Sequence, residues 1–297
     1  MSAARTISYK VLAALGRASM ASGLSSRALR VLGYHDAPDP AALRRQLHFI
    51  RRHFSVTDVA GALDNAESRP LLVTFDDGDP TVVDLGLAVL EEAGVKAVMF
   101  VCPGVIGTSE PFWWEIVQRG IDLGVDVGGA PLTPAALTTM KRLRDPERRA
   151  TTTRIRSRVE EIEERPLQAR QLTLEQLQTW VAAGHAIGNH TWDHPTLDTC
   201  EPGEQERQIV TAHEWLAAHD LMAELVFAYP NGNETAEARA VLERLGYRAA
   251  FLFDHRTGRR DHLAVSRLRV NVDCDMDGFV ARVSGLHPML HSLAGRS

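Results

Sequence analysis

The sequence predicts an α/β protein in which a mostly parallel β-sheet is covered by helices and closes as a barrel. Short apolar runs typical of buried strands alternate with stretches of helical periodicity along most of the 297 residues. A doubly wound open sheet is the alternative. However, no Gly-x-Gly-x-x-Gly motif follows the first strand and no Gly-Lys-Ser/Thr phosphate loop occurs, so the sequence motifs that usually indicate a nucleotide-binding fold are missing.

About seven strand-like runs can be recognised, and each is bounded by polar or turn-forming residues. Several of the helices between them carry clear end signals, such as Thr173 as an N-cap and Gly184 or Gly246 just past a C-terminus. The predicted strands are residues 31–35, 71–75, 97–101, 186–188, 225–229, 249–253 and 268–272, and the clearest predicted helices are residues 40–54, 82–93, 174–183 and 236–245.

Residues 105–170 interrupt the alternation and are predicted to form a helical insertion. Asp145-Pro146-Glu147 indicates a helix start, with Asp145 as N-cap. The many charges of residues 141–170 favour a solvated helix with internal ion pairs over a partner-binding patch. Trp113 and Trp114 could be core residues or could line a sugar site.

The composition describes a globular protein with enough apolar residues for a sizeable core, at 44% hydrophobic and 24% charged. The net charge of −5 gives a nucleic-acid partner no electrostatic support. Cys102, Cys200 and Cys274 are far apart without a Cys-x-x-Cys motif, which indicates free thiols in a reducing compartment. The oligomeric state is left open by the sequence.

Residues 1–29 are predicted to form an N-terminal helical segment. Arg17 interrupts its apolar stretch too early for a secretory signal or a membrane span, so we expect a cytoplasmic protein. Val11, Leu12 and Leu15 lie at helical spacing, which would allow a peripheral membrane contact, although an ordinary packing helix is favoured.

Two adjacent carboxylates, Asp76 and Asp77, end the second strand-like run and precede Gly78. Neighbouring side chains of a strand point to opposite faces, so both carboxylates can share a site only where the strand ends and its backbone turns. Gly78 permits such a turn. An Asp-Gly turn without a chemical role is the alternative interpretation.

His190 and His194 have the spacing of a pair that could bind one metal ion. Spacing alone is weak evidence, because a random chain with 12 histidines would contain about 0.5 pairs four residues apart. His287 and His291 have the same spacing. Position in the predicted fold is better evidence for a site than spacing. Four features follow predicted strands, at the rim where α/β barrels assemble active sites: His35, the Asp76–Asp77 pair, the two histidines and the 229–232 turn. One carboxylate with two imidazoles matches a catalytic divalent metal site, and the second carboxylate is then free to act as a base.

At this point the residues resemble a known family. Thr74-Phe75-Asp76-Asp77-Gly78, His190-Thr191-x-x-His194 and Phe227-Ala228-Tyr229-Pro230-x-Gly232 are similar, in this order, to motifs of the polysaccharide deacetylases, the NodB-like carbohydrate esterases. The resemblance covers about residues 30–275. It implies a distorted (β/α)7 barrel at residues 30–297, with the insertion at about 105–170.

The resemblance also implies roles for individual residues. Asp76 would be the base, and Asp77, His190 and His194 would bind one divalent metal ion, usually zinc, with other transition metals as alternatives. The groove wall and substrate contacts would come from Tyr229, Pro230, Gly232 and Trp114, with the Tyr229 backbone N–H helping to hold the oxyanion.

Two departures from the family pattern matter. Ala228 stands where many members have arginine, and no late Leu-x-x-His motif supplies a general acid. Permuted members resembling the poly-N-acetylglucosamine deacetylases instead carry a Tyr-His on the first strand, and Tyr34-His35 fits them, which makes His35 the expected acid. Without the resemblance, His35 would be interpreted as a core histidine.

The implied reaction is the removal of acetyl groups, in particular N-acetyl groups, from an amino-sugar glycan or its precursor. A metal-bound water deprotonated by Asp76 would attack the acetamide carbonyl, and His35 would protonate the leaving amine. Two alternatives remain: hydrolysis of a non-glycan small amide at the same site, and an inactive glycan-binding module.

Overall fold

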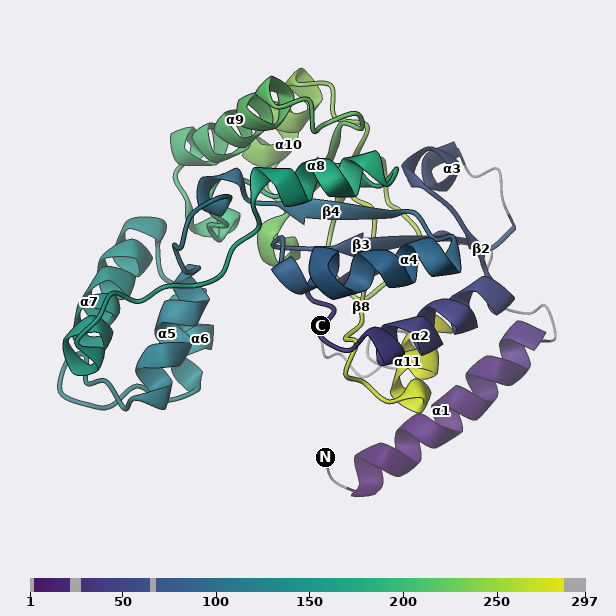
Figure 1. Ribbon diagram of the computed structural model, residues 1–297, viewed down its shortest axis with the longest axis horizontal. Helices are drawn as coiled ribbons and strands as arrows, with labels where there is room; N and C mark the ends of the chain where they lie inside the picture. The colour runs from purple at the N-terminus through teal and green to yellow at the C-terminus, as the bar shows by residue number, and fades with distance from the viewer. Residues whose placement is uncertain (1–2, 22–27, 65–67, 286–297) are drawn as a thin grey trace.

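A parallel sheet of eight strands forms the centre of the computed structural model, which describes residues 3–21, 28–64 and 68–285 (Figure 1). His287 and His291 therefore lie outside the described residues. The order along the sheet is β7-β6-β5-β4-β3-β1-β8, and β2 pairs with β3. The strands are β1 (Arg30–Tyr34), β2 (Ser55–Val56), β3 (Pro70–Phe75), β4 (Ala97–Val101), β5 (Ala186–Asn189), β6 (Val226–Ala228), β7 (Ala249–Phe251) and β8 (Leu268–Arg269).

The sheet is curled, which confirms the predicted barrel class. Its β7 edge meets the segment that precedes β8 at an isolated parallel bridge between Phe251 and Val265. All residues of β1, β3 and β4 are buried, as expected for parallel strands covered on both faces. All seven predicted strands are present, although the last four are shorter than predicted or end one to three residues away; the two-residue β2 was not predicted.

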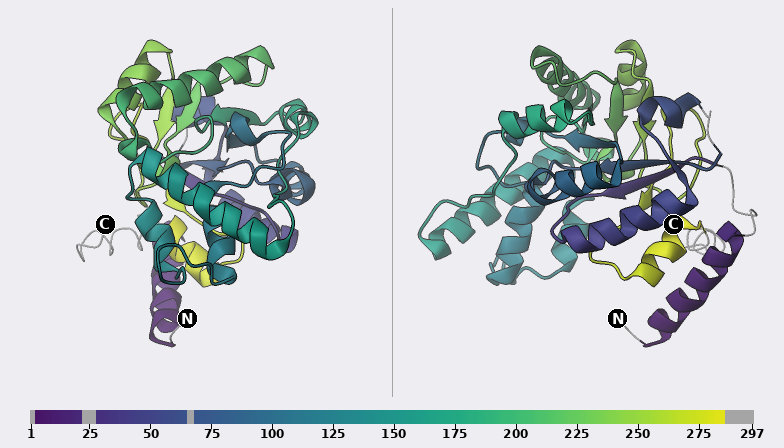
Figure 2. Two further views of the ribbon diagram at one scale, coloured as in Figure 1. Left: turned by 90° about the vertical axis from the view of Figure 1, so that its left-hand side faces the viewer. Right: turned by 45° about the vertical axis from the view of Figure 1, so that its right-hand side comes forward.

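Helices surround the curled sheet, as Figures 1 and 2 show. Thr173 caps α8 through a capping box, as its sequence predicts. The predicted helix over residues 82–93 begins instead with a π-helical turn, Val82–Gly86, before it continues as α4. The surrounding helices are α2 (Pro40–His53), α3 (Val59–Asp64), α4 (Leu87–Ala93), α8 (Leu174–Ala182), α9 (Pro202–Ala218), α10 (Ala236–Arg244) and α11 (Met276–Val283).

The N-terminal helix α1 (Ala3–Ala21) packs against α11, and Arg17 pairs with Asp277 at 2.9 Å. Val11 and Leu15 of this helix are exposed. No helix within the described part of the chain is long and apolar enough to span a membrane. The division into residues 1–29 and 30–297 stays a prediction.

Three helices occupy the segment between β4 and α8: α5 (Trp113–Asp122), α6 (Ala135–Met140) and α7 (Asp145–Glu163). They enclose a small apolar cluster of their own, which includes Ile116, Ile155 and Val159, and lie to one side of the sheet in Figure 1. Asp145 is not the N-cap of α7, because Arg144 precedes the first helical turn and the Asp145 carboxylate instead pairs with Arg148 and Arg149.

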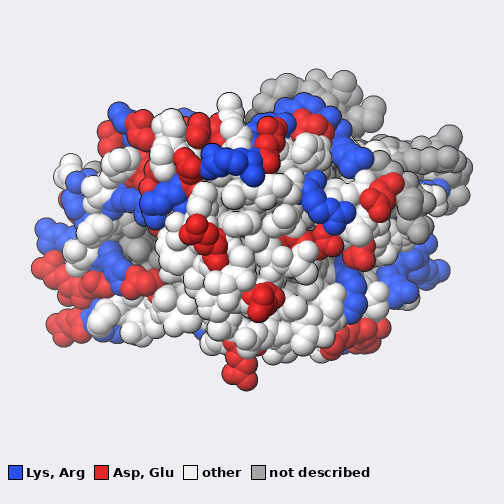
Figure 3. Space-filling model, turned by 90° about the horizontal axis from the view of Figure 1, so that it is seen from above, with Lys and Arg blue, Asp and Glu red and all other residues white. Residues whose placement is uncertain are grey.

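The charges of α7 are largely used within the molecule. Arg156 pairs with Glu160 and Arg158 pairs with Glu161 along the helix, as the predicted solvated helix requires. Figure 3 shows the face above α8 and α9, where basic and acidic side chains are interspersed around a mostly uncharged centre.

His185, just before β5, couples the stability of the sheet to pH. Its Nδ1 accepts a hydrogen bond from the Ala97 N–H at 3.1 Å, and burial, with the charge of Lys96, lowers its pKa from 6.5 to about 4. Between pH 6.5 and about pH 4, His185 is therefore protonated in the unfolded chain and neutral in the folded chain. We expect the free energy of unfolding to fall as the pH drops from about 6.5 to 4, by up to about 1.4 kcal/mol per pH unit.

Denaturant unfolding of wild type and His185→Asn across this range measures the effect, because the asparagine keeps an acceptor for Ala97 but does not titrate. The wild type should lose more stability than the variant. Parallel pH curves for the two proteins would contradict the assignment.

Candidate active site

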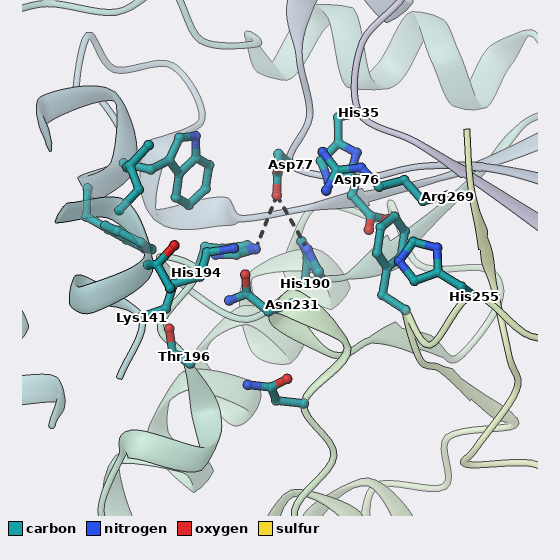
Figure 4. A pocket seen from close by; sticks show the side chains of 16 residues that line it. His35, Asp76, Asp77, Lys141, His190, His194, Thr196, Asn231, His255 and Arg269 are labelled. Carbon is teal, nitrogen blue, oxygen red and sulfur yellow. Dashed lines mark ion pairs between the residues drawn. The ribbon is translucent and has the colours of Figure 1, made fainter. Parts of the chain in front are cut away.

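Side chains suited to hydrolysis gather at the carboxyl ends of neighbouring strands. Asp76 and Asp77 follow β3, His190 follows β5 and His35 follows β1. These strands belong to one parallel run of the sheet, so their carboxyl ends lie at the same rim. Figure 4 shows the four side chains around one cavity. Asn231, from the turn after β6, lies beside His190 and His194.

Strained backbone positions aim several of these side chains. Asp77 has φ +68° and is followed by Gly78 at +77°, so two successive left-handed residues turn the chain and let both carboxylates reach the cavity. His194, Asn231 and His255 also have positive φ and line the same cavity. Four of the eight non-glycine residues described with positive φ thus surround one site, as is typical of functional sites.

Asp77, His190 and His194 converge on one point. The Asp77 Oδ1 lies 3.4 Å from the Nε2 of each histidine, and the three ligand atoms are within 4.8 Å of one another. The Asp77 Oδ1 is buried without a hydrogen-bond partner. His190 Nδ1–H donates to the Ala228 carbonyl at 2.7 Å, which directs Nε2 into the site. This donor set fits a divalent cation such as zinc.

The electrostatics of the three residues suit metal binding. Burial alone would raise the pKa of Asp77, but the adjacent His194 and His190 hold it below its usual value, so the carboxylate is ionised. Burial lowers the pKa of His194 to about 4, which leaves its imidazole neutral. For His190 the contact with Asp77 outweighs burial and raises the pKa. A cation that binds here therefore competes with the protonation of His190.

We expect the purified protein to bind about one divalent cation per chain and Asp77→Ala to lose that binding, because only two imidazoles would remain. Metal analysis and calorimetry measure both. Asp193→Asn is the matched control, since Asp193 lies between His190 and His194 in the loop after β5 but pairs with Arg149. Undiminished metal binding by Asp77→Ala would contradict the assignment.

Asp76 is held by a residue that the sequence did not reveal. The Arg267 guanidinium binds both oxygens of the carboxylate, Nη1 to Oδ1 at 2.6 Å and Nη2 to Oδ2 at 2.8 Å. Arg267 is fully buried and also donates to the Leu252 carbonyl. Burial alone would raise the pKa of Asp76, but Arg267, together with His190, lowers it below the ordinary value. Asp76 is therefore an ionised base in a buried place.

The cavity has a volume of about 620 Å³, within the range of roughly 300–1,000 Å³ of small-molecule sites. Trp114 forms part of its wall, stacked on Phe112 and 4.6 Å from the His194 ring. Of the residues predicted for the site, the cavity is lined by His35, Asp76, Asp77, Trp114, His190 and His194, and further lining residues include Trp113, Lys141, Asn231, Phe253, His255 and Arg269.

Tyr229, Pro230 and Gly232 do not line the cavity. Tyr229 is fully buried, its hydroxyl donates to the Leu263 carbonyl, and its backbone N–H already donates to the Phe251 carbonyl at 3.0 Å. The family motif predicts that this N–H helps to hold an oxyanion, but the N–H is already engaged and that prediction is corrected here. Asn231 turns into the cavity instead, because its backbone is left-handed, with φ +57°.

The profile of the polysaccharide deacetylase family matches residues 64–250, more than half of the chain. The matched region contains Asp76, Asp77, His190, His194 and Asn231, whereas His35 and Arg267 lie outside it.

Solved structures share the fold at low sequence identity. IcaB from Ammonifex degensii is 19% identical, with a TM-score of 0.59 over 88% of this chain and 98% of its own. The Streptococcus pyogenes deacetylase PplD, solved with acetate, is 15% identical, with a TM-score of 0.58 over 86% and 98%. The BpsB deacetylase domain from Bordetella bronchiseptica is 15% identical, with a TM-score of 0.54 over 83% and 97%.

Proposed function

Because the chain belongs to the polysaccharide deacetylase family, we propose that it hydrolyses the N-acetyl amide of an amino-sugar glycan or of its biosynthetic precursor. One observation carries the proposal. An ionised carboxylate, Asp76, lies directly beside the Asp77–His190–His194 group at the rim of the barrel. A base next to a cation site is the arrangement that hydrolysis of an unactivated amide needs.

Asp77, His190 and His194 would hold one divalent cation, and zinc suits two imidazoles and a carboxylate. When bound, such a cation supplies Lewis acidity that activates water and polarises a carbonyl group near neutral pH. Asp77 is ionised and His194 is neutral, so two of the three ligands are already in the protonation state that a cation requires.

Asp76 takes the proton of the attacking water. Each of its oxygens accepts one hydrogen bond from Arg267, which fixes the plane of the carboxylate and leaves lone pairs free for that proton. The water oxygen bonds to the acetyl carbon, and the carbonyl becomes an oxyanion. Arg267 keeps Asp76 ionised between turnovers, although the site is buried.

His35 completes the proton transfer. It lines the same cavity, and its ring and the Phe253 ring are nearly perpendicular, with 5.4 Å between the ring centres. In the second step the C–N bond breaks, the amine nitrogen takes a proton from His35, and acetate leaves. The products are acetate and a free amino sugar.

Asn231 is the donor that we assign to the acetyl oxygen. Its side-chain Nδ2 is buried without a hydrogen-bond partner and the residue lines the cavity. Asn231→Leu keeps the approximate size and removes the donor, so kcat should fall about 10²-fold. Steady-state kinetics with Asn233→Leu as control measures this, because Asn233 lines the cavity but binds Asp198. Equal kcat values for wild type and Asn231→Leu would exclude the role.

The intact machinery argues against an inactive glycan-binding module. Such a module has no use for a fully buried Asp76–Arg267 pair, whose desolvation is costly. The small-amide alternative receives little support from the cavity, because Lys141 and Arg269 among its lining residues are exposed and the site is thus open to solvent.

The experiment that tests the proposal follows both products. Purified protein is incubated with N-acetylglucosamine oligosaccharides, and acetate and primary amine are quantified together. Equal amounts of the two would support N-deacetylation. Acetate without new amine, from an O-acetylated glycan, would move the proposal to ester hydrolysis, and no acetate from either class of glycan would contradict it.

We also infer action inside the cell, on a precursor. Cys102, Cys200 and Cys274 are all free, as suits a reducing compartment. Detection of most of the protein outside the cell membrane in fractionated cells would contradict this location.

A further inference from the structure

Two cationic side chains, Lys141 and Arg269, flank the cavity. Lys141 follows α6 of the insertion, and Arg269 is the last residue of β8. Figure 4 places them on opposite sides of the Asp77–His190–His194 group. Within the described part of the chain, neither side chain forms an ion pair or a hydrogen bond.

Arg269 is directed at the site by the alternation of its strand. Leu268 and Val270 are buried in the core, so residues 267 and 269 share the opposite side. Arg267 reaches the floor of the site and binds Asp76, whereas Arg269 stays exposed at the mouth. The Arg269 guanidinium lies over the Phe253 ring, 5.9 Å from its centre, which holds it in place while its donors remain available.

Lys141 reaches the same cavity from the other wall. Both side chains line the one cavity, and partial burial of the Lys141 ammonium group, followed by the charge of Arg269, lowers its pKa, as expected for two like charges that repel each other across the cavity. The cavity's two carboxylates are already engaged, Asp76 with Arg267 and Asp77 with the two histidines. An anion between the walls would relieve this repulsion.

We propose that Lys141 and Arg269 bind an anionic group, a phosphate or a carboxylate, on the sugar substrate next to the acetamide that is cleaved. The inference rests on the proposed function and narrows its substrate to an anionic amino-sugar glycan or precursor. Lysine provides a point charge and arginine a planar fork, and both groups bind either anion. The volume of about 620 Å³ leaves room for such a group beside the acetyl site.

The test compares three substrates that share an N-acetylglucosamine unit. One carries a phosphate at the reducing end, one is linked to a uronic acid, and one is the neutral methyl glycoside. Wild type should have a kcat/KM at least roughly tenfold higher for an anionic substrate than for the neutral one. The preference should shrink as the ionic strength rises. Which anionic substrate is preferred distinguishes phosphate from carboxylate.

Lys141→Met and Arg269→Met remove the charges but keep most of the apolar stem of each side chain. Each should lower kcat/KM for the preferred anionic substrate roughly tenfold and leave the neutral substrate within about twofold. Arg142→Met is the matched control, because Arg142 is the exposed neighbour of Lys141 and does not line the cavity.

Binding separates this inference from the proposed function. Calorimetry with N-acetylglucosamine 1-phosphate should show affinity that Lys141→Met and Arg269→Met both weaken. If that binding is seen but no substrate yields acetate, the deacetylase proposal fails and the anion site stands. If the neutral substrate is used as well as the anionic ones, or both variants affect all substrates equally, the inference is overturned.

Discussion

Replacing Asp76 with asparagine is expected to lower kcat about 10³-fold while the protein still binds one divalent cation. General-base catalysis contributes roughly 10²–10⁴-fold, and Asp76 is the ionised carboxylate of the cavity that the Asp77–His190–His194 group leaves free. Acetate release under saturating substrate measures kcat, and metal analysis of the same preparation measures the cation. Near wild-type turnover by Asp76→Asn would remove Asp76 from the mechanism.

The comparison of activities must allow for Arg267, the ion-pair partner of Asp76. The asparagine has the shape of the aspartate but leaves the Arg267 charge uncompensated, so some stability should be lost. Activity is therefore compared at a temperature where denaturation curves show both proteins to be fully folded. A loss of kcat in folded, metal-loaded protein then reports the missing base.

Arg267→Met is expected to lower the free energy of unfolding by about 3–5 kcal/mol, the cost of leaving one partner of a buried ion pair alone. Arg267 is completely buried and Asp76 is only 3% exposed, so water cannot replace the lost interactions of the remaining carboxylate. Denaturant unfolding of wild type and variant measures the change. A loss below about 1 kcal/mol would show that the pair contributes little to the native state.

The double variant Asp76→Asn, Arg267→Met separates charge from packing. Removing both charges should recover a large part of the stability lost by Arg267→Met alone, because no unpaired charge stays buried. Activity should stay low, since the base is absent. Additive losses in the double variant would mean that packing of the arginine, rather than its charge, dominates.

The strands and the rim could be predicted because their signals are local. Residues 71–75 are apolar except for Thr74, residues 97–101 are apolar throughout, and both runs are strands. Asp76, Asp77, His190 and His194 follow such runs, and the common direction of parallel strands then brings them together. The direct contact of Asp77 with both histidines follows from this topology.

Arg267 could not be predicted in the same way. It is 191 residues from Asp76 in the sequence, and the two meet only because the sheet curls and brings the segment before β8 beside β7. One signal was available: Ala228 stands where many family members carry arginine. That position suggests that a cation could come from elsewhere in the chain, but the sequence does not single out Arg267 as its source.

Asn231 was missed for a different reason. The 229–232 turn was correctly placed at the rim, but which of its side chains faces the cavity depends on the left-handed backbone of Asn231. Asparagine tolerates that conformation, but the sequence does not show that it is used. Lys141 was likewise beyond prediction, because its position depends on how the insertion packs against the rim.

The most direct test of the whole account is a metal titration of chelator-treated protein, with acetate release from the preferred N-acetylated sugar as the readout. The account predicts activity that rises linearly with added divalent cation and levels off at about one equivalent per chain, with no rise for Asp77→Ala. Activity that is independent of added cation, or an equal response from Asp77→Ala, would contradict the assignment of Asp77, His190 and His194 as the metal site of a deacetylase.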